Sequence, residues 1–279
     1  MMERNQMRDL EFIRSLERIE VAAWSDFHRA ATVEVAVACG VDLLPIDNVC
    51  AAAASKVNVL AFNRVIGLGL RAPTSTSDLF ALIAQYKQRG VPRFFIQACL
   101  PVVGPGLVAS IEEAGLYHYN NWVKLYRAAE PIPKFTSDLE VLQITTEHAE
   151  AFGQIVVDSF EWPQPLVPWV ASSIGRPGWR HYIAFDGDTP VATAAAFFQE
   201  ECAWIDFAAT LPDYRGRGGQ AALLAQRAID ATDLGCKWLV VETAEQTAEQ
   251  SAPSYRNMVR YGFEVAYIRP NYLFTADTI

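Results

Sequence analysis

The sequence predicts an α/β protein built on a mixed sheet with helices on both faces. Three observations lead to this prediction: strand-like and helix-like segments alternate along the chain, glycines stand where several helices should end, and 51% of the 279 residues are hydrophobic. A chain of this length and apolar content can bury one large core or two modest ones, and its length favours two. We therefore expect two related halves.

The first half begins with helical periodicity. Apolar residues recur at helical spacing between Leu10 and about Cys39, which predicts one or two helices before Pro45 interrupts them. The remaining elements of this half are expected in the order β-rich chain over 58–70, helix over 77–89, strand over 93–100, short helix over 106–114 and paired strands over 117–127. Two prolines, Pro131 and Pro133, then indicate a linker over 131–138.

The second half repeats part of this outline. Its expected elements are a strand over 139–145, a helix over 147–160, a proline-rich irregular stretch over 163–177 with a short helix inside it, three meander strands over 180–185, 190–199 and 202–210, a helix over 219–234, a strand over 237–241, a helix over 254–261 and a final pair of strands over 263–274. The similar order indicates a degenerate internal duplication. We expect domains over 1–130 and 139–279, joined by the linker 131–138.

Charge and composition disfavour several classes of protein. A formal net charge of -9 argues against a nucleic-acid partner, because phosphate binding needs a basic face. The chain shows neither a signal-peptide pattern nor a long apolar run, so we expect a cytoplasmic protein without membrane contact. The cysteines are odd in number and far apart, and no histidine stands at ligand spacing, which argues against a disulfide framework and a metal site. They are Cys39, Cys50, Cys99, Cys202 and Cys236, and we expect buried thiols.

The most informative segment is 210–224, where a strand end leads through a glycine-rich loop into an amphipathic helix. Its glycines, Gly216, Gly218 and Gly219, allow a tight turn and close approach of the backbone to a ligand. The first amides of the helix have no partner inside the helix, and the helix dipole favours an anion there. Arg215 and Arg217 add positive charge. The segment predicts a phosphate-binding loop, against the alternative of a glycine-rich turn with two solvated arginines.

This loop resembles the Arg-x-x-Gly-x-Gly/Ala pyrophosphate signature of the GNAT N-acyltransferases, including an x-Pro-x-x-Arg-Gly lead-in that ends at Gly216. Arg215 and Gly218 fill the first two signature positions, and Gln220 replaces the final small residue. The resemblance implies a GNAT fold and acetyl-CoA or another acyl-CoA as co-substrate, with no metal. The residues that it places at the cofactor are Ala209, Thr210, Leu211, Arg215, Gly216, Arg217, Gly218, Gly219, Gln220 and Asn257.

A second, looser resemblance lies in the helix over 254–261 and the Gly-Phe pair after it. Many relatives carry a tyrosine four residues before that glycine, as general acid to the leaving thiolate, and here the position is Met258. Tyr255 or Tyr261 could substitute, or either could pack in the core. The resemblance covers essentially 139–274. The first half resembles the degenerate repeat of tandem GNAT proteins, because the segment 71–75 (Arg-Ala-Pro-Thr-Ser) stands in place of a glycine-rich loop; we expect no cofactor there.

The resemblance also implies a mechanism, in which an amine attacks the thioester directly and the pantetheine arm pairs with backbone over 209–211. A backbone amide near Thr210 would then stabilise the oxyanion. For the general base we name Glu242, at a strand end, and Asp206, whose alternation with Thr210 places both on one face. Either carboxylate could instead serve only in pairing or solvation. Trp162, Trp169 and Trp179 could line a substrate pocket or seal an irregular loop.

We therefore expect an N-acetyltransferase acting on an amine of a small molecule. The rival hypothesis is a non-catalytic acyl-CoA-binding regulatory module, which Met258 and Gln220 motivate. An acyl carrier protein or peptide acceptor is mildly disfavoured, because such partners are often acidic themselves. The two halves could pack within one chain or across a homodimer.

Overall fold

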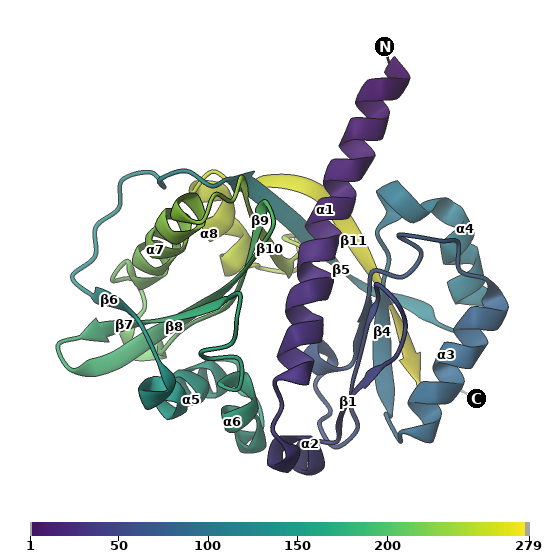
Figure 1. Cartoon of the computed structure of the whole chain (residues 1–279), viewed down its shortest axis with the longest axis horizontal. Coiled ribbons are helices and arrows are strands. Elements are labelled where there is room, and N and C mark those ends of the chain that lie inside the picture. Colours follow the sequence, from purple (N-terminus) through teal and green to yellow (C-terminus); the bar gives the residue numbers. More distant parts are fainter. Residues whose placement is uncertain (1, 277–279) are drawn as a thin grey trace.

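The structure, a computed structural model, describes residues 2–276, with side chains from residue 9 onward. The described strands form a single mixed sheet in the order β1-β2-β3-β4-β11-β5-β10-β9-β8-β7-β6. Figure 1 shows two wings of this sheet on either side of the long helix α1, which contacts strands of both wings. The mixed α/β fold class predicted from the sequence is confirmed.

The first half begins with α1 (Met2–Arg29) and α2 (Val33–Cys39), followed by β1 (Val41–Leu44), β2 (Cys50–Ala54), β3 (Arg64–Ile66), α3 (Thr76–Gln88), β4 (Arg93–Gln97), α4 (Leu100–Glu113) and β5 (Tyr117–Ala128). The sequence analysis missed β1 and β2. Alanines fill most of β2, and alanine is depleted in strands, so only the tertiary packing identifies it. The paired strands expected over 117–127 are in fact one strand, β5.

The second half contains β6 (Glu140–Gln143), α5 (Ala149–Ser159), α6 (Val167–Val170), β7 (Trp179–Asp186), β8 (Thr189–Gln199), β9 (Cys202–Thr210), α7 (Gly219–Asp233), β10 (Trp238–Ala244), α8 (Pro253–Arg260) and β11 (Glu264–Thr275). These elements follow the predicted order. The exception is the C-terminal pair of strands, which is the single strand β11. Register shifts within its pairing to β5 disturb β11 without ending it.

The two halves exchange their last strands. β5, from the first half, pairs with β10 of the second, and β11 pairs with β4 of the first half and with β5. In each half a helix connects two parallel strands: α3 connects β3 and β4, and α7 connects β9 and β10. This parallel arrangement supports an internal duplication. The division into domains at 131–138 stays a prediction, because the halves share one sheet.

Three cores stabilise this arrangement. The central core lies between α1, α2, α5 and α6 on one face of the sheet, and the other two lie beneath α3 and α4 and beneath α7 and α8. Trp169 is fully buried against Phe27 and Phe62, and Trp179 donates its indole N–H to Asp26. Trp169 and Trp179 therefore seal the loop around α6 against α1, whereas Trp162 is half-buried and packs on Phe62 and Phe160. All the cysteines are buried free thiols, as expected.

Buried charges join the halves at the centre of the sheet. Glu17 and Glu20 of α1 are both fully buried and pair with Lys124 of β5 and Arg269 of β11, the two exchanged strands. Burial alone would raise the pKa of Glu20, but the cations Arg269, Lys124 and Arg64 lower it to about 2. Removing one member of such a cluster leaves a buried charge without a partner, which is strongly destabilising.

Within residues 2–276, none of the helices combines the length and the apolar character that crossing a membrane would require.

Candidate functional site

The loop between β9 and α7 is built for close backbone approach. A single 3₁₀ turn, Pro212–Tyr214, follows β9, and α7 begins at Gly219. Gly216 and Gly218 adopt φ values of 82° and 78°, a left-handed conformation that side chains other than glycine's disfavour. Gly216 and Gly218 are thus required by the shape of the loop.

The amide groups of this loop point to an anion site. The first backbone bond into α7 runs from Ala222 N–H to the Gly218 carbonyl, and none of the N–H groups from Gly216 to Ala221 has an acceptor among the described residues. Consecutive unpaired amides at a helix N-terminus form a cradle for phosphate oxygens. This part of the loop therefore fits the diphosphate of a coenzyme A thioester.

The arginines of the loop are less free than their positions in the sequence suggest. Arg217 forms hydrogen-bonded ion pairs with Asp186 and Asp138. The hydrogen bond to Asp186 makes the largest contribution to raising the pKa of the Arg217 guanidinium, followed by the hydrogen bond to Asp138. Arg215 is exposed and donates from Nε to the Thr210 carbonyl at 3.3 Å. Gln220 donates to Thr210 Oγ1 at 3.2 Å and so connects the two ends of the loop. Arg215 is thus the arginine of this pair that no carboxylate neutralises within the described chain.

The linker packs directly against the loop. A Cβ on Gly218 would lie 2.1 Å from the Thr136 carbonyl oxygen, and one on Gly219 would lie 3.0 Å from a methyl carbon of Leu139. A larger residue at position 218 would therefore displace the linker as well as block a ligand. For this reason Gly218 is a poor place to test cofactor binding alone.

Next to the loop, β9 and β10 separate. In this parallel pair, only Cys202–Trp204 of β9 are paired with Trp238–Val240 of β10. Both strands continue beyond these residues without pairing to each other. A bulge interrupts β9 at the same level: its register against β8 shifts after Asp206, and Phe207 has a φ of 48°. The extra residue reverses the alternation of side chains. The expectation that Asp206 and Thr210 share a face is therefore wrong: Asp206 contacts Trp204 on the α1 side, and Thr210 contacts Gln220 of α7.

The two carboxylates predicted as bases lie at this separation, in different surroundings. Continuing the register of β9 and β10 places Asp206 opposite Glu242. Burial raises the pKa of Asp206. Hydrogen bonds from the Phe207 amide and the Trp204 indole lower this pKa, as does the charge of Arg64, but the effect of burial is larger. Glu242 instead pairs with Arg64, at 3.0 Å from Nη1, and with Arg269. The carboxylate of Glu242 is thus held by two guanidinium groups.

The other predicted residues lie around the separation. The Leu211 amide already donates to the Val191 carbonyl, so it is not free for a pantetheine arm. Tyr255 and Asn257, on α8, are half-buried and make no side-chain hydrogen bond within the described chain, whereas Met258 is buried in the core beneath α7 and α8. The same core packs against Tyr255 and Tyr261. Position 258 is therefore structural.

Arg64 is the important residue that the sequence analysis missed. It comes from β3 of the first half, is 2% exposed, and stacks 3.9 Å from the Trp24 ring centroid while pairing with Glu242. The available signal was an arginine inside the short apolar strand Arg64–Ile66, because a charged residue in a buried strand needs a partner. The described residues form no cluster of three or more histidine, cysteine or acidic side chains that could hold a metal ion.

Similar solved structures share this fold. A GCN5-related N-acetyltransferase from Kribbella flavida is 17% identical, with a TM-score of 0.56 over 77% of this chain and 82% of that chain. A GCN5-related N-acetyltransferase from Sphaerobacter thermophilus is 14% identical, with a TM-score of 0.57 over 76% of this chain and 71% of the other. A tandem GNAT protein from the clavulanic acid biosynthesis pathway is 14% identical, with a TM-score of 0.53 over 77% and 75%.

A search of curated proteins found no match to this sequence. The family model described as acetyltransferase (GNAT) family matches residues 142–258, a span that begins in β6 and ends in α8. This span contains the glycine-rich loop, the separation of β9 and β10 and both candidate carboxylates. Residues 142–258 therefore form a domain of the GNAT acetyltransferase family.

Proposed function

We propose that the protein is an acyl-CoA-dependent N-acyltransferase that acylates an amine of a small molecule. The observation that carries the proposal is the run of unpartnered amides from Gly216 to Ala221, placed beside the separation of β9 and β10. Amides of this kind suit the diphosphate of coenzyme A, and the unpaired stretch of β9 suits an extended arm. Acetyl-CoA is the co-substrate that the GNAT family suggests.

The thioester supplies an activated acyl group, so the chain needs no nucleophile of its own. Asp206 is the side chain best suited to accept the ammonium proton of the acceptor, because a carboxyl with a raised pKa is a more effective base near neutral pH. Glu242, with its negative charge balanced by Arg64 and Arg269, is better suited to hold the walls of the site. The bulge at Phe207 redirects the backbone of β9 toward the separation.

The second candidate function is a non-catalytic acyl-CoA-binding module. Two observations favour it: Met258 is buried where many relatives carry a tyrosine, and Arg217 is engaged by Asp138 and Asp186. Loss of a general acid weakens catalysis without abolishing it, since positioning of the reactants can contribute more than a single acid or base. Turnover therefore decides between the two functions.

The first experiment measures binding and turnover together. Purified protein is titrated with acetyl-CoA by calorimetry, and free thiol release is then followed with a panel of small amines. Binding with release of thiol on at least one amine supports the enzyme. Binding without release on any amine supports the regulatory module, and absence of binding contradicts both.

A variant of Asp206 tests the assignment of the base. Asp206→Asn should lower kcat by about 100-fold or more, as expected for loss of a general base, and leave the affinity for acetyl-CoA unchanged. The activity of the unmodified protein should fall as pH is lowered through the raised pKa of Asp206, and this dependence should disappear in the variant. Asp188→Asn, in the exposed turn between β7 and β8, is the matched control. An unchanged kcat would remove Asp206 from the mechanism.

A further inference from the structure

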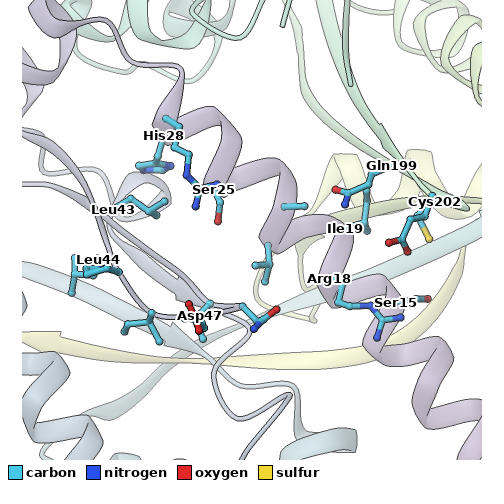
Figure 2. A pocket seen from close by; sticks show the side chains of 18 of the residues that line it. Ser15, Arg18, Ile19, Ser25, His28, Leu43, Leu44, Asp47, Gln199 and Cys202 are labelled. Carbon is cyan, nitrogen blue, oxygen red and sulfur yellow. The ribbon is translucent and has the colours of Figure 1, made fainter. Parts of the chain in front are cut away.

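A trough of about 1210 Å³ runs along α1, separate from the site described above. Figure 2 shows it between α1, the chain around β1 and the turn between β8 and β9. It reaches β9 at Cys202, the end of that strand opposite Thr210. The trough therefore belongs to the junction of the two halves and not to the candidate acyl-transfer site.

One wall of the trough is the edge of β1. Every residue from Val41 to Val49 lines it, including each residue of β1 in turn. Because side chains alternate between the two faces of a strand, a cavity that touches successive residues borders the edge and not a face. β1 pairs with β2 and with no other strand among residues 2–276, so this edge is open.

The hydrogen bonds show which backbone groups face the trough. Ala54, opposite Val41, directs its N–H and carbonyl to the side chain of Asn63, so Val41 and Ala54 do not bond to each other. In an antiparallel ladder, hydrogen-bonded and non-hydrogen-bonded pairs of residues alternate. Val41 and Leu43 therefore both belong to non-hydrogen-bonded pairs, and their backbone groups point away from β2 toward the trough. Leu43 N–H is taken by the Asp42 carboxylate at 2.8 Å. The N–H and carbonyl of Val41 and the carbonyl of Leu43 have no partner in the described chain.

The second half shows what covers such an edge. There the strand after the two helices is β7, as β1 is in the first half, and its outer edge pairs antiparallel with β6. No strand among residues 2–276 fills the corresponding position beside β1. The trough thus lies beside β1 in the first half, at the position that β6 occupies beside β7 in the second half.

The side chains around the trough suit a particular occupant. The α1 side is lined by the small residues Ser15, Ala22 and Ser25 together with Ile19, which leaves room for apolar side chains. Among the carboxylates around the trough, Glu11 pairs with Arg18, Asp42 with Arg89 and Glu201 with Lys237. Asp47 and Glu200 have no cation partner in the described chain, and Arg29 is the remaining cation of the lining. The two unpaired carboxylates, Asp47 and Glu200, favour lysine or arginine in the occupant.

We propose that this trough binds an extended basic peptide segment of another protein by strand addition to β1. Alternate apolar side chains of the segment lie on Ile19 and Ala22, and its basic side chains face Asp47 and Glu200. The backbone groups of Val41 and the carbonyl of Leu43 form the hydrogen bonds. This inference does not rest on acyl transfer, because the trough shares no residue with that site.

The test uses the whole protein and a peptide probe, acetyl-Lys-Val-Lys-Val-Lys-Val-amide, with binding measured by calorimetry. The same peptide with glutamate in place of lysine, and the lysine peptide with alternate backbone nitrogens methylated, should each bind at least about 10-fold more weakly. Bound lysine peptide should also slow hydrogen exchange of the Val41 amide.

Charge variants provide the matched control. Asp47→Lys combined with Glu200→Lys should weaken peptide binding by about 10-fold or more, whereas Glu161→Lys combined with Asp188→Lys, the same charge change on exposed residues outside the trough, should not. The proposal is overturned if the lysine peptide does not bind, if the methylated peptide binds equally well, or if the double variant in the trough has no effect.

Discussion

The two halves build the same connection with opposite chemistry at the helix start. In the second half, the loop before α7 leaves the amides from Gly216 to Ala221 without partners among residues 2–276. In the first half, Ser75 accepts from the Asp78 amide while the Asp78 carboxylate accepts from the Ser75 amide, a capping box that closes the start of α3. The helix start of the second half is open to an anion, and in the first half the chain supplies its own carboxylate. This difference gives a physical reason for expecting a cofactor only in the second half.

The largest effect is expected where the halves meet, at Lys124. Replacing this fully buried lysine (Lys124→Met) removes the cation shared by Glu17 and Glu20, and should lower the free energy of unfolding by about 3–5 kcal/mol. Chemical denaturation measures the loss. Lys237→Met is the control, since Lys237 pairs with Glu201 on the surface and should contribute less than about 1 kcal/mol. Equal effects of the two variants would contradict a central role for the buried cluster.

The next effect concerns the open helix start. Gln220→Glu places a negative charge among the free amides of α7 and should weaken acetyl-CoA binding by about 30-fold, roughly 2 kcal/mol, because like charges at the diphosphate repel. Calorimetry measures the affinity. Gln143→Glu makes the same charge change at an exposed position on β6 and should leave the affinity unchanged. If both variants bind acetyl-CoA normally, the cofactor does not use this loop.

A third comparison uses one buried histidine from each half. Burial lowers the pKa of His28 to about 4 and that of His181 to about 3. The unfolded chain therefore binds more protons than the folded one below about pH 6.5, and stability falls as pH falls. When the pH is lowered from about 8 to about 5.5, each histidine should lower the free energy of unfolding by about 1.4 kcal/mol.

Denaturation of His28→Gln and His181→Gln at both pH values checks this directly. Each variant should lose about 1.4 kcal/mol of the pH dependence, whatever its stability at high pH. A variant that keeps the full pH dependence would show that its histidine is protonated in the folded state.

The smallest effect belongs to the closed helix start. Ser75→Ala removes the capping side chain of α3 and should lower the unfolding free energy by about 1 kcal/mol. Acetyl-CoA affinity should not change, because this helix start lies in the other half. A change in affinity would mean that the two loops are coupled.

The sequence predicted most elements of the second half, because its strands and helices are long and end at clear turn residues. It also located the glycine loop, whose residues are local in the chain. The failures have physical causes: the alanines of β2 carry no strand signal, and the bulge at Phe207 reverses the side of Thr210 relative to Asp206. The pairing of Glu242 with Arg64 joins residues 178 positions apart, and no local pattern reveals it.

The exchange of β5 and β11 has a consequence for synthesis of the protein. As the nascent chain leaves the ribosome, β4 and β5 emerge well before the strand that lies between them, residues 264–275. Until then the first half exposes unpaired strand edges, which are templates for aggregation. The sheet therefore cannot close while only the first half has been synthesised, and chaperones that shield strand edges should matter more for this chain than for a GNAT domain whose strands are all its own.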